Sequence, residues 1–275
     1  MNRILILGGS GFIGYTLYKE LCQYMPTYGT YFSNKSFVEN QHFLRFDMET
    51  EGLEPILKRL NPTHIISSIR GDFEAQTELH QELAQYSKQS RCKIIFLSSA
   101  NVFDAFSNYP SYEFDKTLSE SIYGKVKIKA ENLFLRLPQK QYVIARLPMV
   151  FGSQSPRIKE LKTFLTQKNA YEVFPNLVMN VTTASKLAQQ IHYIINRSKD
   201  GIFHLGTYDL VHHDEFIQEL SHKLGFVKPL FKKVYTSNQD RFLAVLPKDS
   251  LLPKHLQINS YEVIDESVLP LRNYS

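Results

Sequence analysis

Short apolar runs alternate with amphipathic segments along the first half of this chain. The first run, Ile4 to Leu7, is apolar at every position, which is typical of a parallel strand buried on both faces. Later runs predict strands at residues 27–32, 41–46, 64–68, 93–98 and 142–147, with helical periodicity between most of them. Because strands that alternate with helices usually pair in parallel, this pattern predicts an α/β fold with a doubly wound parallel sheet.

A glycine-rich turn follows the first strand directly. Gly8, Gly11 and Gly14 are spaced three apart and lead into a segment with helical periodicity. In a dinucleotide site, the first glycine allows the sharp turn and the second lets the pyrophosphate approach the backbone. The third lets the helix lie close to the sheet, with its N-terminus facing the phosphates. The sequence therefore predicts a Rossmann-type sheet that binds a dinucleotide.

The pattern loosens beyond residue 152. It predicts helices at 159–167, 185–197 and 213–224 and a short strand at 201–206, whereas proline interrupts the residues from 251 onward, which we leave unassigned. We therefore expect residues 1–152 to form the Rossmann domain, which binds NADP(H). Residues 153–275 should mainly form a smaller C-terminal α/β lobe that binds the substrate, with some segments returning to the Rossmann sheet.

Composition narrows the range of partners. The 275 residues contain no apolar run long enough to span a bilayer and begin with a strand, so we expect a cytoplasmic protein with no membrane partner. The net charge of +5 is not gathered into basic blocks, which favours a phosphorylated small molecule over nucleic acid. Cys22, Cys92 and the histidines lack metal-ligand spacing, so we expect no metal site.

A tyrosine and a lysine one turn apart form a candidate catalytic pair. Tyr123 and Lys127 share a face of a predicted helix. A phenol is a weak acid near neutrality, with a pKa of about 10, but a nearby ammonium stabilises the phenolate and lowers that pKa. Ser99, at the carboxyl end of a strand, offers a hydroxyl to a carbonyl oxygen shared with Tyr123. With a dinucleotide, this set predicts hydride transfer at a carbon whose oxygen is protonated by Tyr123.

The end of the second strand bears on the choice of cofactor. A carboxylate there binds the ribose 2′-hydroxyl of NAD and repels a 2′-phosphate. This chain has no acid in that segment and instead offers Tyr31, Asn34 and Lys35. We therefore expect NADPH to be preferred over NADH; the alternative is that Lys35 is an ordinary loop lysine.

Several segments resemble the extended short-chain dehydrogenase/reductase superfamily, and within it the dTDP-4-dehydrorhamnose reductase-like branch. The resemblance rests on the segments at residues 8–14, 97–104, 123–127, 145–152 and 201–206. It implies an oxidoreductase that reduces a keto group, with a nucleotide-activated sugar as substrate. It also implies that Ser99, Tyr123 and Lys127 are the catalytic set, with Tyr123 as the acid and Lys127 also holding the nicotinamide ribose.

Further site residues come from the motif, the second strand and the resemblance together. The cofactor-binding set comprises Gly8, Ser10, Gly11, Phe12, Ile13, Gly14, Tyr31, Asn34, Lys35, Asp47, Ser67, Ser68, Ile69, Ser98, Tyr123, Lys127, Pro148 and Met149. On the substrate side we expect Arg70, Asn101 and Asn180. Arg70 lies just past a strand at the active edge, where it would bind a substrate phosphate or pair with Asp72.

The sequence departs from the branch on the substrate side. An aspartate and a tyrosine of the branch are Ala100 and Asn101 here, the usual tryptophan is Met149, and a different segment surrounds Asn180. The sugar and its nucleotide therefore stay open. So do two other functions, a nucleotide-sugar epimerase or dehydratase with bound NAD and a non-catalytic NADP-binding sensor or subunit. The assembly, monomer or homodimer, is open too.

Overall fold

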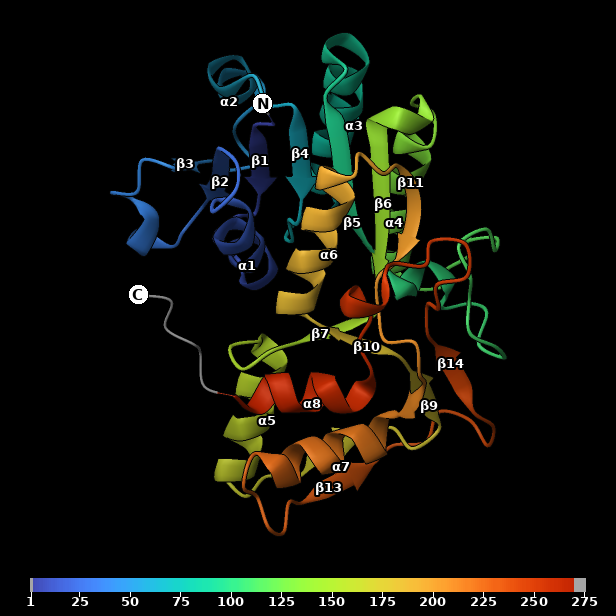
Figure 1. The fold of residues 1–275 in the computed structure, drawn as a ribbon. Helices are drawn as coiled ribbons and strands as arrows, with labels where there is room; N and C mark the ends of the chain where they lie inside the picture. The colour runs from blue at the N-terminus through green and yellow to red at the C-terminus, as the bar shows by residue number, and fades with distance from the viewer. Residues whose placement is uncertain (1, 270–275) are drawn as a thin grey trace.

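A seven-stranded parallel sheet forms the centre of the structure (Figure 1). The structure is a computed structural model, and it describes residues 2–269. The strands are β1 (Ile4–Leu7), β2 (Thr27–Tyr31), β3 (Phe43–Arg45), β4 (His64–Ser67), β5 (Lys93–Ser99), β6 (Tyr142–Leu147) and β11 (Gly201–His204). Their order is β11-β6-β5-β4-β1-β2-β3, so the direction of winding reverses between β1 and β4. Doubly wound sheets bind ligands at the carboxyl edge beside this reversal. The predicted fold class is confirmed.

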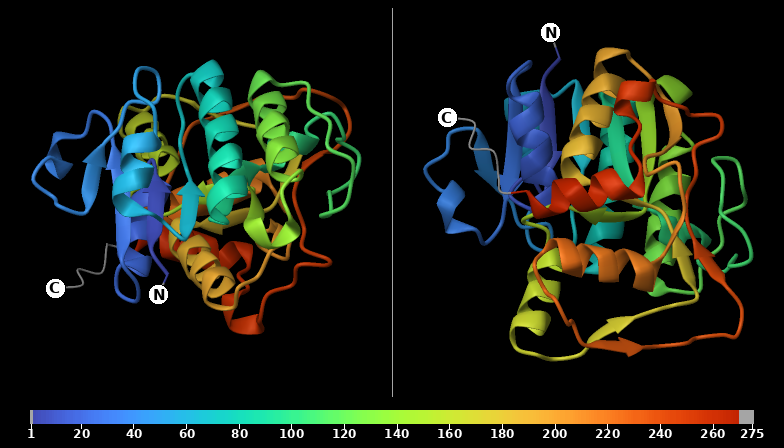
Figure 2. Two further views of the ribbon diagram at one scale, coloured as in Figure 1. Left: turned by 90° about the horizontal axis from the view of Figure 1, so that it is seen from above. Right: turned by 60° about the horizontal axis from the view of Figure 1, so that its bottom comes forward.

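Helices cover both faces of this sheet, as the two further views show (Figure 2). One face packs against α1 (Phe12–Leu21) and α6 (Ala184–Asn196), and the other against α2 (Glu54–Leu60), α3 (Phe73–Ser90) and α4 (Ile122–Phe134). Ile4 and Ile6 point into the first core and Leu5 and Leu7 into the second. Burial on both faces explains why this strand is apolar at every position.

The second lobe lies below the carboxyl edge of the sheet in Figure 1. It contains α5 (Pro156–Thr166), α7 (His213–Lys223), α8 (Ser260–Val268), β8 (Tyr171–Val173), β9 (Leu177–Met179), β12 (Val211–His212), β13 (Phe231–Lys233) and β14 (Arg241–Leu243). The short parallel pair β7 (Met149–Phe151) and β10 (Val181–Thr183) lies where the two lobes meet. Short 3-10 turns occur at Lys35–Phe37, Ala100–Phe103, Gln139–Gln141 and Lys254–Leu256.

Several boundaries differ from the predicted ones for local reasons. Helix α5 begins at Pro156 rather than at residue 159, because the Ser155 hydroxyl accepts from the Ile158 N–H and proline suits the first turn of a helix. Helix α8 was not predicted, yet Asn259 and Glu262 form a capping box at its start. None of the helices within residues 2–269 is long and apolar enough to cross a membrane.

Candidate active site

The glycine turn after β1 is tightly packed on one side and open on the other. Gly8 has a φ of +76°, and a Cβ placed on Gly14 would lie 2.1 Å from the Gly8 carbonyl oxygen. A Cβ on Gly11 would meet only that same oxygen, at 3.3 Å. Gly8 and Gly14 are therefore required by the fold itself, whereas Gly11 leaves space that a ligand can use.

The turn delivers unpaired N–H groups to this space. Gly11 caps α1 without a side-chain hydrogen bond, and no acidic residue occupies the first turn of that helix. Ser10 is held by its N–H, which donates to the Thr30 carbonyl at 3.1 Å, and the Gly8 N–H donates to the Thr30 hydroxyl at 2.9 Å. The N–H groups of the residues that follow, beginning with Phe12 and Ile13, lie at the positive end of the helix dipole, where a phosphate is stabilised.

Tyr123 and Lys127 lie on one face of α4, as their spacing predicts. The Lys127 ammonium is 5.6 Å from the centroid of the Tyr123 ring. Helix α4 starts at a fixed point because the Ser121 hydroxyl accepts from the Gly124 N–H and donates to the Asp104 carboxylate at 2.5 Å. Asp104 therefore anchors the turn of helix that carries the tyrosine.

Gly124 brings this helix against the segment that contains Ser99. A Cβ on Gly124 would lie 2.3 Å from the Asn101 carbonyl oxygen and 2.1 Å from the Ser119 hydroxyl. Ser99, at the end of β5, donates its hydroxyl to the Asn101 amide oxygen at 3.0 Å and accepts from the Asn101 N–H. Asn101 therefore contacts Ser99 through its side chain and its N–H, and its carbonyl oxygen is the point at which α4 comes closest.

Lys127 is almost completely buried, with 5% of its surface exposed. Its ammonium donates to the Leu97 carbonyl oxygen at 3.2 Å and lies 4.7 Å from the centroid of the Phe96 ring. Burial and then the positive charge of Arg70 lower the pKa of Lys127 to about 8, although Glu131 opposes this. An ammonium has three donors, so one protein acceptor leaves Lys127 able to bind ligand oxygens.

A buried ion pair supports α4 one turn beyond Lys127. Glu131 and Arg146 are 2% exposed each and meet at 2.8 Å, and Arg146 also donates to the Glu113 carbonyl. The Ser98 hydroxyl donates to Glu131 at 2.5 Å. The side chain of Ser98 therefore belongs to this ion-pair network, which leaves only its backbone for the predicted contact with a cofactor.

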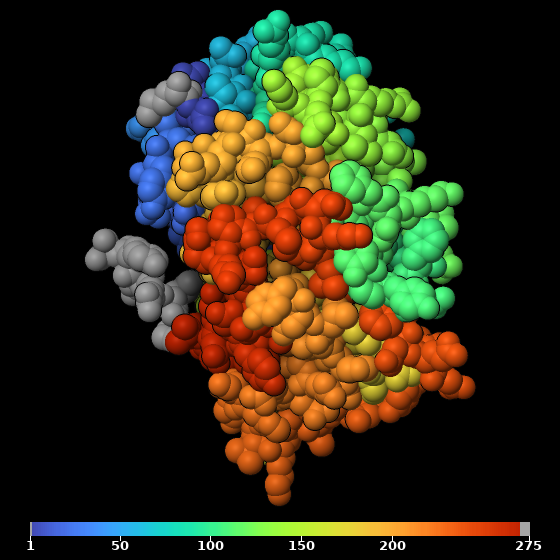
Figure 3. Space-filling view, turned by 45° about the vertical axis from the view of Figure 1, so that its right-hand side comes forward, coloured from blue at the N-terminus to red at the C-terminus, as the bar shows by residue number. Residues whose placement is uncertain are grey.

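The loop that leads into α4 is fastened to the C-terminal part of the chain. The Glu113 carboxylate accepts from the N–H groups of Lys248, Asp249 and Ser250, and Ser111 forms a single bridge with Val245. Figure 3 shows this loop in green, lying against the orange-red C-terminal segment. The position of Tyr123 thus depends on residues far away in the sequence.

Residues 67–259 match the model of the family described as RmlD substrate binding domain. The chain belongs to this family. The expected relationship to the extended short-chain dehydrogenases/reductases, in their dTDP-4-dehydrorhamnose reductase-like branch, is confirmed. A search of curated proteins gave no match.

Solved structures share the fold of this RmlD family member. The dTDP-glucose 4,6-dehydratase of Bacillus anthracis, in complex with NAD, has a TM-score of 0.80 at 18% identity, over 98% of this chain and 96% of that one. The UDP-glucose 4-epimerase of Brucella ovis, in complex with NAD, has a TM-score of 0.79 at 17% identity, over 98% of both chains. The dTDP-4-dehydrorhamnose reductase of Bacillus anthracis, in complex with NADP, has a TM-score of 0.73 at 18% identity, over 97% of this chain and 98% of that one.

The end of β2 carries no acid in this member of the RmlD family. Tyr31 ends the strand. Asn34 caps the 3-10 turn that follows, because its amide oxygen accepts from the N–H and the hydroxyl of Ser36. Lys35 is exposed and forms no ion pair within residues 2–269. The Asp47 carboxylate accepts from the Glu49 N–H at 3.1 Å and from the Thr50 hydroxyl at 2.9 Å, so it mainly shapes its own turn.

The residues after β4 have structural partners. The Ser67 hydroxyl is 2.9 Å from a ring nitrogen of His80, and the Ser68 hydroxyl donates to the Leu7 carbonyl at 2.7 Å. Ile69 packs against the core beside β1. Ser68 thus joins the carboxyl ends of β1 and β4 beside Gly8, whereas Ser67 joins β4 to α3.

On the substrate side of the site, Asn180 does not fit its predicted role in substrate binding. It is fully buried, its amide group donates to the Thr207 and Val245 carbonyls, and its oxygen accepts from the Val245 N–H. Every donor of this amide is therefore used inside the fold. Pro148 and Met149, which the resemblance places beside the nicotinamide, lie at the same junction: Met149 is in β7, and a Cβ on Gly206 would lie 2.8 Å from Pro148.

Asp72 also has a structural role. One of its carboxylate oxygens accepts from the Glu74 and Ala75 N–H groups, which caps α3. Within residues 2–269 no ion pair joins it to Arg70, which is exposed. The alternative in which these two residues pair is therefore wrong, and Arg70 is available to a ligand.

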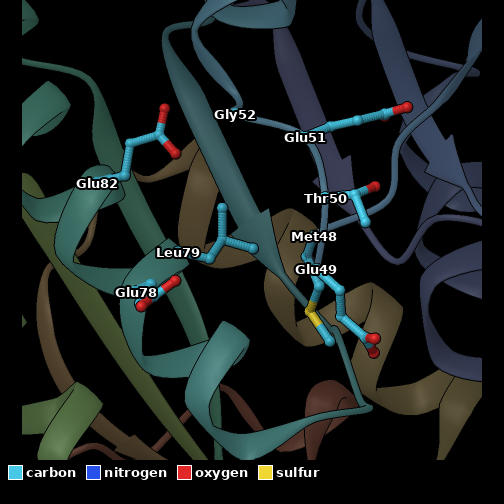
Figure 4. Close-up of a pocket in the computed structure, with 8 residues that line it drawn as sticks. All are labelled: Met48, Glu49, Thr50, Glu51, Gly52, Glu78, Leu79 and Glu82. Carbon is cyan, nitrogen blue, oxygen red and sulfur yellow. The ribbon is translucent and has the colours of Figure 1, made fainter.

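Two surface hollows are lined by none of the predicted site residues. One has a volume of about 280 Å³ and is lined by four glutamates, Glu49, Glu51, Glu78 and Glu82, together with Met48, Thr50, Gly52 and Leu79 (Figure 4). The other, of about 390 Å³, is lined by Ser107, Asn108 and residues 236–241. No group of histidine, cysteine and acidic side chains suited to a metal ion occurs within the described part of the chain.

Proposed function

We propose that this protein is an NADPH-dependent reductase of a keto group, with a nucleotide-activated sugar as its substrate. The observation that carries the proposal is the Tyr123–Lys127 pair on α4, held at the sheet edge that also bears the glycine turn. Membership of the RmlD family and the likeness to nucleotide-sugar reductases, dehydratases and epimerases support the same class of enzyme.

The residues at the sheet edge fit a nicotinamide dinucleotide. The open side of Gly11 and the free N–H groups of α1 suit its pyrophosphate, and Lys127 has donors left for its ribose. Exposed Lys35, with no acid at the end of β2, favours the 2′-phosphate of NADPH, although NADH is compatible with the rest of the site. When bound, this cofactor supplies the hydride.

Residues of the chain supply the proton for the carbonyl oxygen and stabilise the negative charges that form. Tyr123 donates the proton to the carbonyl oxygen as the alcohol forms. Lys127, close to the Tyr123 ring and without a carboxylate partner in the described residues, stabilises the phenolate that remains. Ser99 turns its hydroxyl from Asn101 to the carbonyl oxygen and supports the negative charge that develops there.

The test is oxidation of NADPH in the presence of a panel of keto substrates. The panel contains 4-keto nucleotide sugars and simple aldehydes and ketones, and the variant Tyr123→Phe serves as the control. We expect turnover of at least one 4-keto nucleotide sugar and a loss of at least about 100-fold in kcat for the variant, because a positioned acid contributes about that much. Full activity of the variant would refute the assigned acid, and tight NADPH binding without turnover would favour the sensor or subunit.

A further inference from the structure

The end of β3 brings a second cation to the cofactor side of the sheet. Strands β2 and β3 pair in parallel, with Arg45 opposite Tyr31, and the Phe46 N–H donates to the Tyr31 carbonyl at 2.9 Å. Neighbouring strands lie about 4.8 Å apart. Arg45 therefore lies one strand away from the end of β2, where a Rossmann-type sheet selects between NADPH and NADH.

Strand β2 is joined directly to the glycine turn. The Ser10 N–H donates to the Thr30 carbonyl, and the Gly8 N–H donates to the Thr30 hydroxyl. Thr30 directly precedes Tyr31 in the strand. A dinucleotide whose pyrophosphate binds at the glycine turn would therefore place its adenosine ribose near the ends of β2 and β3.

The Arg45 guanidinium lies between the segments that follow β2 and β3. It is 6.0 Å from the centroid of the Phe32 ring, one residue past β2, and it meets the carboxylate of Glu51, in the turn after β3, at 2.6 Å. The other oxygen of Glu51 accepts from the Asp47 N–H at 3.0 Å. The guanidinium is therefore held at the carboxyl edge of the sheet, the edge that also bears the glycine turn.

The contact with Glu51 is one that a phosphate can replace. Both side chains are partly exposed, 55% for Arg45 and 39% for Glu51, and an exposed ion pair contributes only about 0 to 1 kcal/mol. A guanidinium binds a phosphate through two parallel hydrogen bonds, which are stronger than hydrogen bonds between neutral groups. Arg45 can therefore exchange Glu51 for a phosphate, and Glu51 competes for the same donors.

We propose that Arg45 and Glu51 form an exchangeable pair that sets the cofactor preference. Arg45 leaves Glu51 to bind the 2′-phosphate of NADPH, whereas with NADH the ion pair stays closed. Glu51 opposes the phosphate in two ways, because it holds the guanidinium and because its own charge repels the ligand. The inference rests on the proposed function for the presence of a nicotinamide dinucleotide, and it adds a determinant on β3 to the one expected at Lys35 after β2.

The experiment compares the dissociation constants of NADPH and NADH, measured by fluorescence titration of the full chain. Arg45→Ala removes the guanidinium. Glu51→Gln removes the competing charge and keeps an oxygen that accepts from the Asp47 N–H. Lys58→Ala and Glu54→Gln are the matched controls, because Glu54 and Lys58 on α2 form an exposed ion pair that is also 2.6 Å long. Calorimetry with adenosine 2′,5′-bisphosphate and adenosine 5′-monophosphate isolates the effect of the 2′-phosphate from that of the nicotinamide.

We expect Arg45→Ala to raise the Kd of NADPH about tenfold and that of NADH less than about twofold, since a hydrogen bond to a charged group is worth about that factor. Glu51→Gln should lower the Kd of NADPH about threefold and leave that of NADH unchanged. The control variants should leave both constants unchanged, and the bisphosphate should follow NADPH while the monophosphate follows NADH.

Two results would overturn the exchangeable pair. One is an equal effect of Arg45→Ala on both dinucleotides, or no effect on either. The other is a Glu51→Gln variant that binds NADPH no more tightly than wild type.

These outcomes are separable from the proposed function. A protein that binds NADPH but reduces none of the keto substrates contradicts the reductase, and its binding constants still report the effect of Arg45. A protein that reduces a substrate with the same preference for NADPH over NADH in Arg45→Ala as in wild type contradicts the exchangeable pair alone.

Discussion

The buried ammonium of Lys127 predicts that an inactive variant should be more stable than the wild type. Burial and Arg70 lower the pKa of Lys127 from 10.5 to about 8, and 5% of the residue is exposed. This pKa difference of about 2.5 between the unfolded and the folded state means that keeping the lysine charged in the folded protein costs about 3 kcal/mol of free energy. Lys127→Met removes the charge and fills similar space, but it also removes the hydrogen bond to Leu97, worth about 1 kcal/mol.

The net gain for Lys127→Met should therefore be about 2 kcal/mol at pH 7. The size of this gain depends on pH in a defined way. Below pH 8 the wild-type lysine is charged in both the folded and the unfolded state, whereas between about 8 and 10.5 only the unfolded chain holds the proton. Wild-type stability thus rises with pH through this window, and the advantage of the variant should fall by about 2 kcal/mol between pH 7 and about pH 10.

Urea unfolding at these two pH values measures the effect. Lys125→Met, at an exposed position of the same helix, is the control and should show no pH-dependent difference from wild type. A variant of Lys127 that is less stable than wild type at pH 7, or a gain that is the same at both pH values, would refute the reasoning. The gain should accompany loss of NADPH oxidation, because the same unpaired charge holds the ribose and the phenolate in the proposed mechanism.

Three further predictions concern the cofactor site and its support. Gly14→Ala should destabilise the fold by more than about 2 kcal/mol, since its Cβ meets the Gly8 oxygen at 2.1 Å, whereas Gly11→Ala should keep thermal stability and weaken NADPH binding. Lys35→Ala should raise the Kd of NADPH about tenfold and leave that of NADH unchanged, by fluorescence titration; an unchanged ratio would remove Lys35 from the argument. Glu131→Gln should lower the free energy of unfolding by about 3 kcal/mol, because it leaves the Arg146 charge buried without a counter-charge, and a loss below about 1 kcal/mol would contradict this.

The parts of the fold with local signals were predictable. The strand before Gly8 is apolar at every position because both faces are buried, and the spacing of the glycines follows from the close packing between Gly8 and Gly14. The pair Tyr123–Lys127 follows from helical periodicity alone. Each of these features depends on residues close together in the sequence.

Features that depend on distant partners were not predictable. The sequence predicts that Asn180 binds the substrate. In the structure its amide group donates hydrogen bonds to the carbonyls of Thr207 and Val245, which are 27 and 65 residues away. The capping box of α8 was a missed local signal, because Asn259 and Glu262 have the required spacing but follow a segment interrupted by proline.

The central claim is that Tyr123 completes a hydride transfer from NADPH to a keto carbon, and deuterium transfer tests it most directly. NADPH deuterated on the transferred position is incubated with the panel of 4-keto nucleotide sugars, and the products are analysed by mass spectrometry. The account predicts deuterium on the carbinol carbon of one product, with transfer lost and NADPH binding kept in Tyr123→Phe. Transfer at the wild-type rate by this variant, or no transfer to any substrate by a protein that binds NADPH tightly, would contradict it.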